Sequence, residues 1–292
     1  MNKLMNTKFL ILAVVFAMIS WLPSAANAAD DLMNPSTEMT TSELTQALPD
    51  VKSPIILESN DLVGVSFWLI SMALVAASIF FFMETQRVSS KWKTSLTVSG
   101  LVCLVAAVHY FYMRDVWVST GSTPTVYRYI DWLITVPLLM IEFYLILSAV
   151  TKVSVGIFWR LLVGTIVMLV GGYLGETGYM NLTAAFVIGM AGWAYIIYEI
   201  FLGEASKVSA SKAPPAVQSA FKTMRIIVTV GWAIYPLGYV FGYFTGSGPE
   251  DSMRSLNIIY NLADVVNKIG FGLVIWAVAT KMSDEAIIPA KS

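Results

Sequence analysis

Residues 125–148 read TVYRYIDWLITVPLLMIEFYLILS, and this stretch decides the fold class. It is mostly apolar and longer than the roughly 20 residues that a membrane-spanning helix needs. Three charged side chains and one threonine follow spacings of three, four and seven residues, so a helix places them on one face: Arg128, Asp131, Thr135 and Glu142. Charges at membrane depth are costly and usually serve function. The stretch therefore predicts a membrane helix with a functional face.

The rest of the chain has the same apolar character. Only 13% of its residues are charged, against about 25% in soluble domains. Short polar connectors, the longest at 204–219, separate seven apolar stretches of spanning length: roughly 61–84, 93–113, 125–148, 154–175, 178–202, 220–246 and 253–281. We predict an all-α membrane protein, a seven-transmembrane-helix bundle over residues 59–283 with a tail at 284–292. The net charge of −1 gives no sign of a nucleic-acid partner.

The N-terminal segment has the pattern of a secretory signal peptide. Two lysines precede an apolar stretch at 9–22, and Ala26 and Ala28 supply an A-x-A cleavage site. We predict a cleaved signal peptide over 1–28; the alternative is an uncleaved extra helix. Residues 29–58 are polar and are predicted to form a flexible extracytoplasmic tail.

Basic residues are distributed unequally between the two ends of the predicted bundle. With the N-terminus outside, only three lie in the outer segments, and many more lie in the inner ones: Arg87, Lys91, Lys93, Lys152, Arg160, Lys207, Lys212, Lys222, Arg225, Lys281 and Lys291. Cytoplasmic segments carry the excess of basic residues in membrane proteins. This bias agrees with the signal peptide and predicts a cytoplasmic C-terminus.

The seventh stretch contains a lysine near its middle. Asp264 precedes Lys268 by four residues, hence by one turn on the same helical face. Desolvation would drive a lone buried lysine to its neutral form, and a nearby carboxylate would keep it charged. One interpretation is a structural ion pair; the other is a nucleophile that forms a Schiff base with an aldehyde.

The two acids of the third stretch are candidates for a proton path. Asp131 and Glu142 are eleven residues apart, or about 16 Å along a helix, which is too far for them to share one proton. They are either two stations on one path or two unrelated acids. In the predicted orientation Asp131 lies toward the outside, Glu142 lies toward the cytoplasm, and Asp264 lies on the outer side of Lys268. This order favours outward transport.

Three motifs resemble the signatures of the proteorhodopsin family of microbial rhodopsins, in the green-absorbing type. They are RYIDWLITVPL at 128–138, GWAIYP at 231–236 and NLADVVNK at 261–268, and the resemblance extends from about residue 60 to residue 280. It implies a light-driven outward proton pump of the bacterial inner membrane that generates a proton-motive force. All-trans retinal would be bound covalently to Lys268 as a protonated Schiff base.

The resemblance also implies roles for the buried charges. Asp131 would be the main counterion and first proton acceptor, and Asp264 the second counterion. Arg128 would lie between them and the outer exit, and Glu142 would donate a proton from the cytoplasmic side. The trio of Asp131, Thr135 and Glu142 resembles the outward-pump set, and sensory relatives typically lack the donor acid.

His109, the single histidine, has two interpretations. Alone, it is a structural residue in an apolar helix, and one histidine cannot build a histidine-rich metal site. The resemblance instead implies that it hydrogen-bonds the main counterion. The family also implies a homo-oligomer, a pentamer or a hexamer.

Several aromatic and apolar residues are expected to line the retinal pocket. Aromatic side chains are common at membrane interfaces, but the resemblance places these against retinal: Trp132, Leu139, Trp232, Tyr235 and Pro236. Leucine at 139 implies green rather than blue absorption. Some relatives carry a carotenoid antenna that needs a glycine opening; Phe186 matches that position, so no carotenoid is expected.

Other classes of function stay open at this point. A light sensor would signal to a separate membrane partner with little steady transport. A seven-helix receptor or carrier would bind no retinal. An enzyme is the weakest interpretation, because no nucleophile with a paired base is visible.

Overall fold

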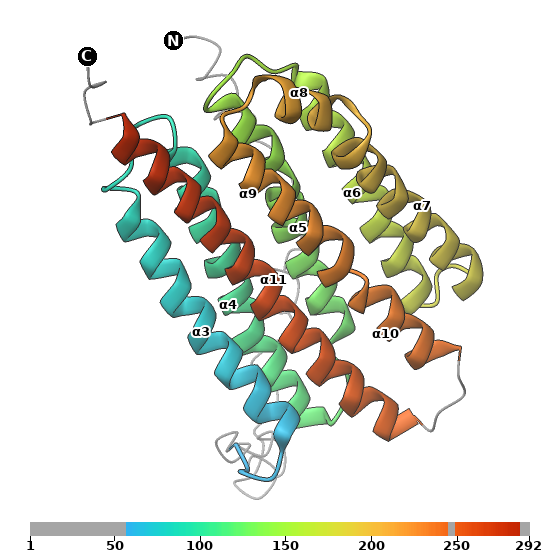
Figure 1. Cartoon of the computed structure of the whole chain (residues 1–292). Coiled ribbons are helices and arrows are strands. Elements are labelled where there is room, and N and C mark those ends of the chain that lie inside the picture. The colour runs from blue at the N-terminus through green and yellow to red at the C-terminus, as the bar shows by residue number, and fades with distance from the viewer. Residues whose placement is uncertain (1–56, 245–248, 287–292) are drawn as a thin grey trace, which may run out of the picture. The chain divides into compact units, whose positions relative to one another are not determined.

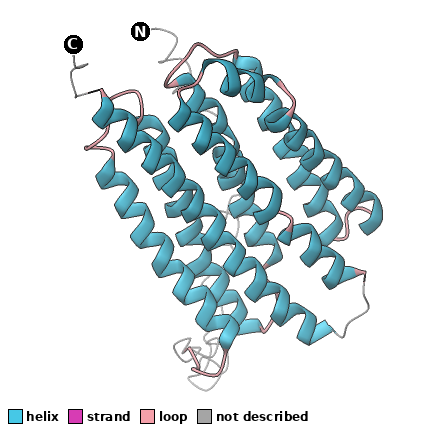
Figure 2. Ribbon diagram, in the orientation of Figure 1, coloured by secondary structure: helices cyan, strands magenta, loops and turns pink. Residues whose placement is uncertain are grey.

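The structure, a computed structural model, describes the backbone of residues 57–244 and 249–286, and the side chains of these apart from 249–253. The described part consists of helices and the loops between them (Figure 2). In chain order the elements are α3 (Leu62–Glu84), α4 (Lys93–Thr120), α5 (Thr125–Ser148), α6 (Val155–Glu176), α7 (Leu182–Phe201), α8 (Glu204–Lys212), α9 (Pro215–Ile226), the π-helical turn η3 (Ile227–Gly231), α10 (Ile234–Tyr243) and α11 (Pro249–Glu285). The predicted signal peptide and nearly all of the predicted tail lie outside the described residues.

The seven-helix membrane bundle predicted from the sequence is confirmed. Within the described residues, seven helical stretches are long and apolar enough to cross a membrane: Leu62–Glu84, Lys93–Thr120, Thr125–Ser148, Val155–Glu176, Leu182–Lys212, Pro215–Tyr243 and Arg254–Glu285. Helices that follow each other in the chain pack as neighbours, and α11 packs against α3, so the last span lies beside the first (Figure 1).

Helix α5 is the centre of the bundle. Its residues 135–147 are buried without a break, because α4, α6, α8, α9 and α11 all pack against it. A helix segment that is surrounded by other helices is apolar around most of its circumference, so the largely apolar run of 135–147 follows from its central place. Polar groups on such a helix face other protein groups rather than lipid.

The predicted 204–219 connector is mostly helical in the structure. Helix α8 occupies Glu204–Lys212, and α9 begins at Pro215, so only residues 213–214 join them. Glu204 lies in the first turn of α8 and Lys212 in its last, the arrangement that the helix dipole favours. Pro215 occupies the first turn of α9, where the missing N–H costs no hydrogen bond. The polar composition of 204–219 therefore does not mean that the segment lacks secondary structure.

The fourth and fifth spans approach each other closely through glycine. A Cβ atom at position 192 would lie 2.6 Å from the backbone nitrogen of Met168 and 2.8 Å from the carbonyl oxygen of Gly164. Only glycine allows this contact between α6 and α7. The two helices therefore pack closely along one wall of the central cavity described below.

Candidate functional site

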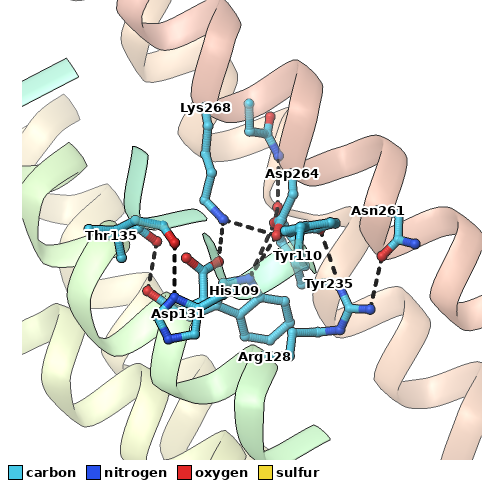
Figure 3. Close-up of polar contacts among 12 residues, drawn as sticks. His109, Tyr110, Arg128, Asp131, Thr135, Tyr235, Asn261, Asp264 and Lys268 are labelled. Atoms are coloured by element: carbon cyan, nitrogen blue, oxygen red, sulfur yellow. Dashed lines mark hydrogen bonds and ion pairs between the residues drawn. The ribbon is translucent and has the colours of Figure 1, made fainter. Parts of the chain in front are cut away.

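The centre of the site is a buried lysine between two carboxylates (Figure 3). Lys268 Nζ on α11 donates to Asp131 Oδ2 on α5 at 2.6 Å and to Asp264 Oδ2, one turn away, at 2.9 Å. Lys268 is only 3% exposed, and the two acids are at 1% or less. The sequence spacing predicted the Asp264 pair, whereas Asp131 joins it through the packing of α5 against α11.

The two carboxylates are bonded very unequally. Asp264 also accepts from Tyr110 Oη at 2.7 Å, from Tyr235 Oη at 2.6 Å and from Trp132 Nε1 at 3.2 Å. Asp131 Oδ1 is buried and has no hydrogen-bond partner among the described residues. A proton added to Asp264 would have to displace a donor, whereas Asp131 has an oxygen ready to receive one. The geometry therefore separates a carboxylate that is saturated with hydrogen bonds from one that keeps an open oxygen.

Arg128 is held by neutral groups. Its Nη2 donates to Asn257 Oδ1 and to Asn261 Oδ1, each at 2.9 Å, and its Nη1 donates to Tyr110 Oη at 3.3 Å. No ion pair within 4 Å joins it to a described carboxylate. Arg128 and Lys268 together carry two positive charges, and Asp131 and Asp264 together carry two negative charges. The buried cluster is therefore neutral overall. Buried charges are tolerated when they are balanced and hydrogen-bonded in this way.

Thr135 and His109 lie beside Asp131 without bonding its carboxylate. The Thr135 hydroxyl donates to the Asp131 backbone carbonyl at 2.9 Å. His109 Nδ1 contacts the Val105 carbonyl oxygen, one turn earlier on α4, at 2.9 Å. No hydrogen bond joins the His109 ring to the Asp131 carboxylate within the described part of the chain. The His109 hydrogen bond that the family resemblance implies therefore stays a prediction.

Glu142 lies apart from the lysine cluster, because it is eleven residues further along α5 than Asp131. Its side chain is fully buried, and neither carboxyl oxygen has a hydrogen bond of regular geometry among the described residues. The Ser95 side chain on α4 is a polar neighbour that interacts with it. No described cation pairs with it, so burial favours the neutral acid over the anion. Such a group can store a proton.

An apolar cavity begins at Lys268 Nζ and extends between α5, α6, α7, α10 and α11. All five residues that the sequence predicted for a retinal pocket line it: Trp132, Leu139, Trp232, Tyr235 and Pro236. Residues from α6 and α7 complete the wall: Met168, Leu169, Gly172, Gly189, Met190 and Trp193. The sequence did not single these out, because an apolar residue that faces a cavity looks the same as one that faces lipid.

The π-helical turn η3 shapes one wall of this cavity. The Trp232 amide donates to the Ile227 carbonyl, five residues earlier, at 3.1 Å. The Val228 carbonyl is thereby left to accept from Trp193 Nε1 on α7 at 3.1 Å. Asn267 Nδ2 on α11 donates to the Gly231 carbonyl at 3.3 Å. Such turns are frequent at functional sites, and this one is held by two residues of the cavity wall.

A third acid in the lining was missed by the sequence analysis. Glu176 accepts from Tyr129 Oη at 2.7 Å and from Tyr243 Oη at 2.9 Å, and it lines the cavity together with Tyr129. Glu176 is one residue beyond the predicted fourth span, so the sequence placed it in the connector between the fourth and fifth spans. Its tyrosine partners come from α5 and α10, which no local sequence signal reveals.

Fold and site define a class: a multi-pass, seven-helix membrane protein with a charge-balanced lysine at one end of an apolar cavity. The sequence also matches the model of the family described as bacteriorhodopsin-like protein, over residues 61–282. The chain belongs to this family.

The chain is a close homologue of proteorhodopsins. It is 59% identical over 230 residues to the green-light absorbing proteorhodopsin of Gamma-proteobacterium EBAC31A08, and 57% identical over 230 residues to the blue-light absorbing proteorhodopsin of Gamma-proteobacterium Hot 75m4. Each alignment covers 79% of this chain and 91% of the relative. The crystal structure of the blue light-absorbing proteorhodopsin from Med12 superposes with a TM-score of 0.66 at 54% identity, covering 76% of this chain and all of that one. The similar identities do not separate the green type from the blue.

Proposed function

We propose that this chain is a light-driven proton pump that moves protons outward across the bacterial inner membrane, with all-trans retinal held on Lys268 as a protonated Schiff base. It is on this proposal a transporter rather than an enzyme, and it generates a proton-motive force. The single observation that carries the proposal is the unequal bonding of the carboxylates beside Lys268 Nζ. Asp264 is a fixed anion that accepts from four side chains, and Asp131 has a buried oxygen open to a proton.

The residues of the cavity fit retinal. Lys268 and Asp264 line the otherwise mostly apolar cavity, and Trp132, Trp232 and Tyr235 provide flat surfaces for a polyene. Retinal bound there supplies absorption of visible light and a light-driven change of shape. Leu139 brings no polar group to the lining, which supports green absorption. Phe186 also lines the cavity and packs against Tyr239 at 5.4 Å between ring centroids, which supports the absence of a carotenoid.

The proposed proton path runs between Lys268, Asp131 and Glu142. A proton held at Lys268 Nζ passes to Asp131, whose Oδ2 is 2.6 Å away. Asp264 stays ionised throughout, because Tyr110, Tyr235 and Trp132 all donate to it. Arg128, held by the two asparagines, keeps a positive charge near the exit. Glu142 then returns a proton toward Lys268 from the opposite end of α5.

The direction follows from the proposed orientation. Helix α8 and the second half of α9 carry the lysines and arginine that favour the cytoplasmic side, and α3 begins at the opposite end of the bundle (Figure 1). Asp131 stands in the first half of α5 and Glu142 in the second, so the acceptor faces outward and the donor inward. The homo-oligomer, a pentamer or a hexamer, stays a prediction.

Light-driven acidification is the direct test. Cells that express the full chain with all-trans retinal are suspended in a weak buffer, and external pH is recorded under green light. We expect the medium to acidify in the light, and a protonophore to abolish the change. Coloured cells without a pH change would instead support a sensor, and colourless cells would remove the retinal assignment.

Replacement of the proposed donor should slow one step only. In Glu142→Gln the return of a proton to Lys268 Nζ should slow by about 100-fold, the lower range for loss of a general acid, while its loss to Asp131 proceeds normally. Flash absorption spectroscopy resolves the two phases. Asp284→Asn, an exposed acid near the end of α11, is the control and should behave as the parent. Unchanged decay in Glu142→Gln would exclude the donor role.

A further inference from the structure

A second cavity, separate from the one at Lys268, lies at the end of the bundle where α8 and α9 meet. Its volume is about 280 Å³, and six of its seven lining residues have polar side chains: Ser206, Ser209, Gln218, Ser219, Lys222 and Arg225; the seventh is Ala210. It shares no residue with the lysine cavity. Two cations line it, and among the described residues no acid does.

Arg225 carries a charge that no described acid neutralises. Its Nη1 donates to the Ile200 carbonyl at 3.4 Å, and its Nε is buried without a hydrogen-bond partner in the described part of the chain. The guanidinium lies over the rings of Phe201 and Phe221, at 4.8 Å and 5.4 Å from their centroids. These aromatic faces hold the cation in position and leave its charge in place.

The acids nearest in the chain are already paired. Glu199 and Glu204, at the end of α7 and the start of α8, both accept from Arg160 on α6, at 2.9 Å and 2.7 Å. Glu199 also accepts from the Ala205 amide at 3.1 Å. Arg160 therefore has two carboxylate partners, whereas Arg225 and Lys222 have none among the described residues. The imbalance favours an anion from outside the chain.

The donors of the cavity converge from two helices. Lys222 and Arg225 are three residues apart, on one face of α9, and Ser206 and Ser209 are three residues apart on α8. Guanidinium, ammonium and hydroxyl groups together form the donor set that recognises phosphate oxygens. The cavity also lies at an end of the spans, where basic pockets meet lipid headgroups.

We propose that this α8–α9 cavity binds a phosphate-type oxyanion, either the phosphate of an anionic phospholipid or inorganic phosphate. The bound anion bridges α8 to the start of the sixth span through Arg225 and Lys222. Residues 213–214 and the hydrogen bond from Gln218 Nε2 to the Ala210 carbonyl at 3.4 Å already connect the two helices, and the bound anion adds a further link between them. The site is independent of the retinal proposal, because none of its residues lines the lysine cavity.

The test uses the purified full chain in a maltoside detergent, stripped of lipid, in phosphate-free buffer at fixed ionic strength. One arm adds phosphatidylglycerol and counts retained lipid by native mass spectrometry. The other adds inorganic phosphate and follows the thermal unfolding midpoint against equal ionic strength of chloride. We expect saturable binding in at least one arm. Binding of phosphatidylglycerol without binding of inorganic phosphate would identify a lipid headgroup site. Binding of inorganic phosphate would identify a site for the free anion. No saturable binding in either arm would overturn the proposal.

Variants that each remove one positive charge distinguish binding in the cavity from non-specific attraction of an anion to a basic surface. Lys222→Gln should weaken binding by about tenfold, as expected for the loss of one charge-assisted hydrogen bond, and Arg225→Gln by more. Lys207→Gln removes the same charge from an exposed position on α8 outside the lining and should bind as the parent does. Because Arg225 packs on two rings, its variant could misfold; the exposed Lys222 keeps the test decisive. Equal weakening in Lys207→Gln and Lys222→Gln would refute the site.

Discussion

Membranes that contain Lys268→Ala protein should stay colourless when all-trans retinal is added, and they should pump no protons in the light. The substitution removes the Nζ atom that opens onto the apolar cavity, so no amine remains there to bind an aldehyde covalently. Absorption spectra of reconstituted membranes measure the loss. Lys207→Ala, an exposed lysine of α8, is the control and should develop full colour. Retinal-dependent colour in Lys268→Ala would refute the covalent assignment.

The same substitution should also destabilise the protein, so a second variant is needed to distinguish a loss of retinal binding from a loss of folding. Without Lys268, Asp131 and Asp264 are both buried beside an empty position, and an uncompensated buried charge costs about 3–5 kcal/mol. The double variant Lys268→Ala with Asp131→Asn removes one charge of each sign and should recover much of this loss, as thermal unfolding would show. It should still be colourless. Colour that returns with stability would mean that the single variant had failed only to fold.

Asp131→Asn should bind retinal, absorb at longer wavelength and lose pumping by at least about 100-fold. An asparagine accepts no proton from Lys268 Nζ, and Asp264, with its donors already in place, offers no equivalent oxygen. The red shift has an electrostatic cause. The Asp131 carboxylate stabilises positive charge localised at Nζ, 2.6 Å away, so removing it lowers the energy needed to move that charge away.

Light-induced pH changes at matched expression, together with absorption spectra, test this variant. Asp115→Asn provides a matched control, since Asp115 is half-exposed on α4 and pairs with Arg114 away from the lysine cluster. That control should keep both colour and pumping. Pumping at the parent level in Asp131→Asn would remove Asp131 from its proposed role, and an unshifted spectrum would remove it as the main counterion.

Much of this protein follows from its sequence because membrane burial leaves a strong local signal. The seven spans are apolar runs of spanning length, and the helices fall close to the predicted ranges. The Lys268–Asp264 pair follows from the i,i+4 geometry of any helix. The polar face of 125–148 follows for the same reason, and Asp131, Thr135 and Glu142 are all buried in the structure. These features depend only on hydrophobicity and helical period.

Other features depend on which helices pack together, and no local pattern encodes that. Asp131 is 137 residues from Lys268 in the chain and reaches it only because α5 lies against α11. The same packing supplies Asn257 and Asn261 to Arg128, gives Asp264 its tyrosine donors, and leaves Asp131 Oδ1 without one. It also gives Glu176 its tyrosine partners.

The sequence by itself thus determined the spans, the buried charges and their order along each helix, because these follow from the cost of placing charge in an apolar medium and from the 3.6-residue turn. Only the tertiary structure decided which carboxylate is saturated with hydrogen bonds and which is open to a proton. That difference arises from side chains that α4, α5 and α10 bring to Asp264 and not to Asp131. That difference supports Asp131 as the proposed proton acceptor.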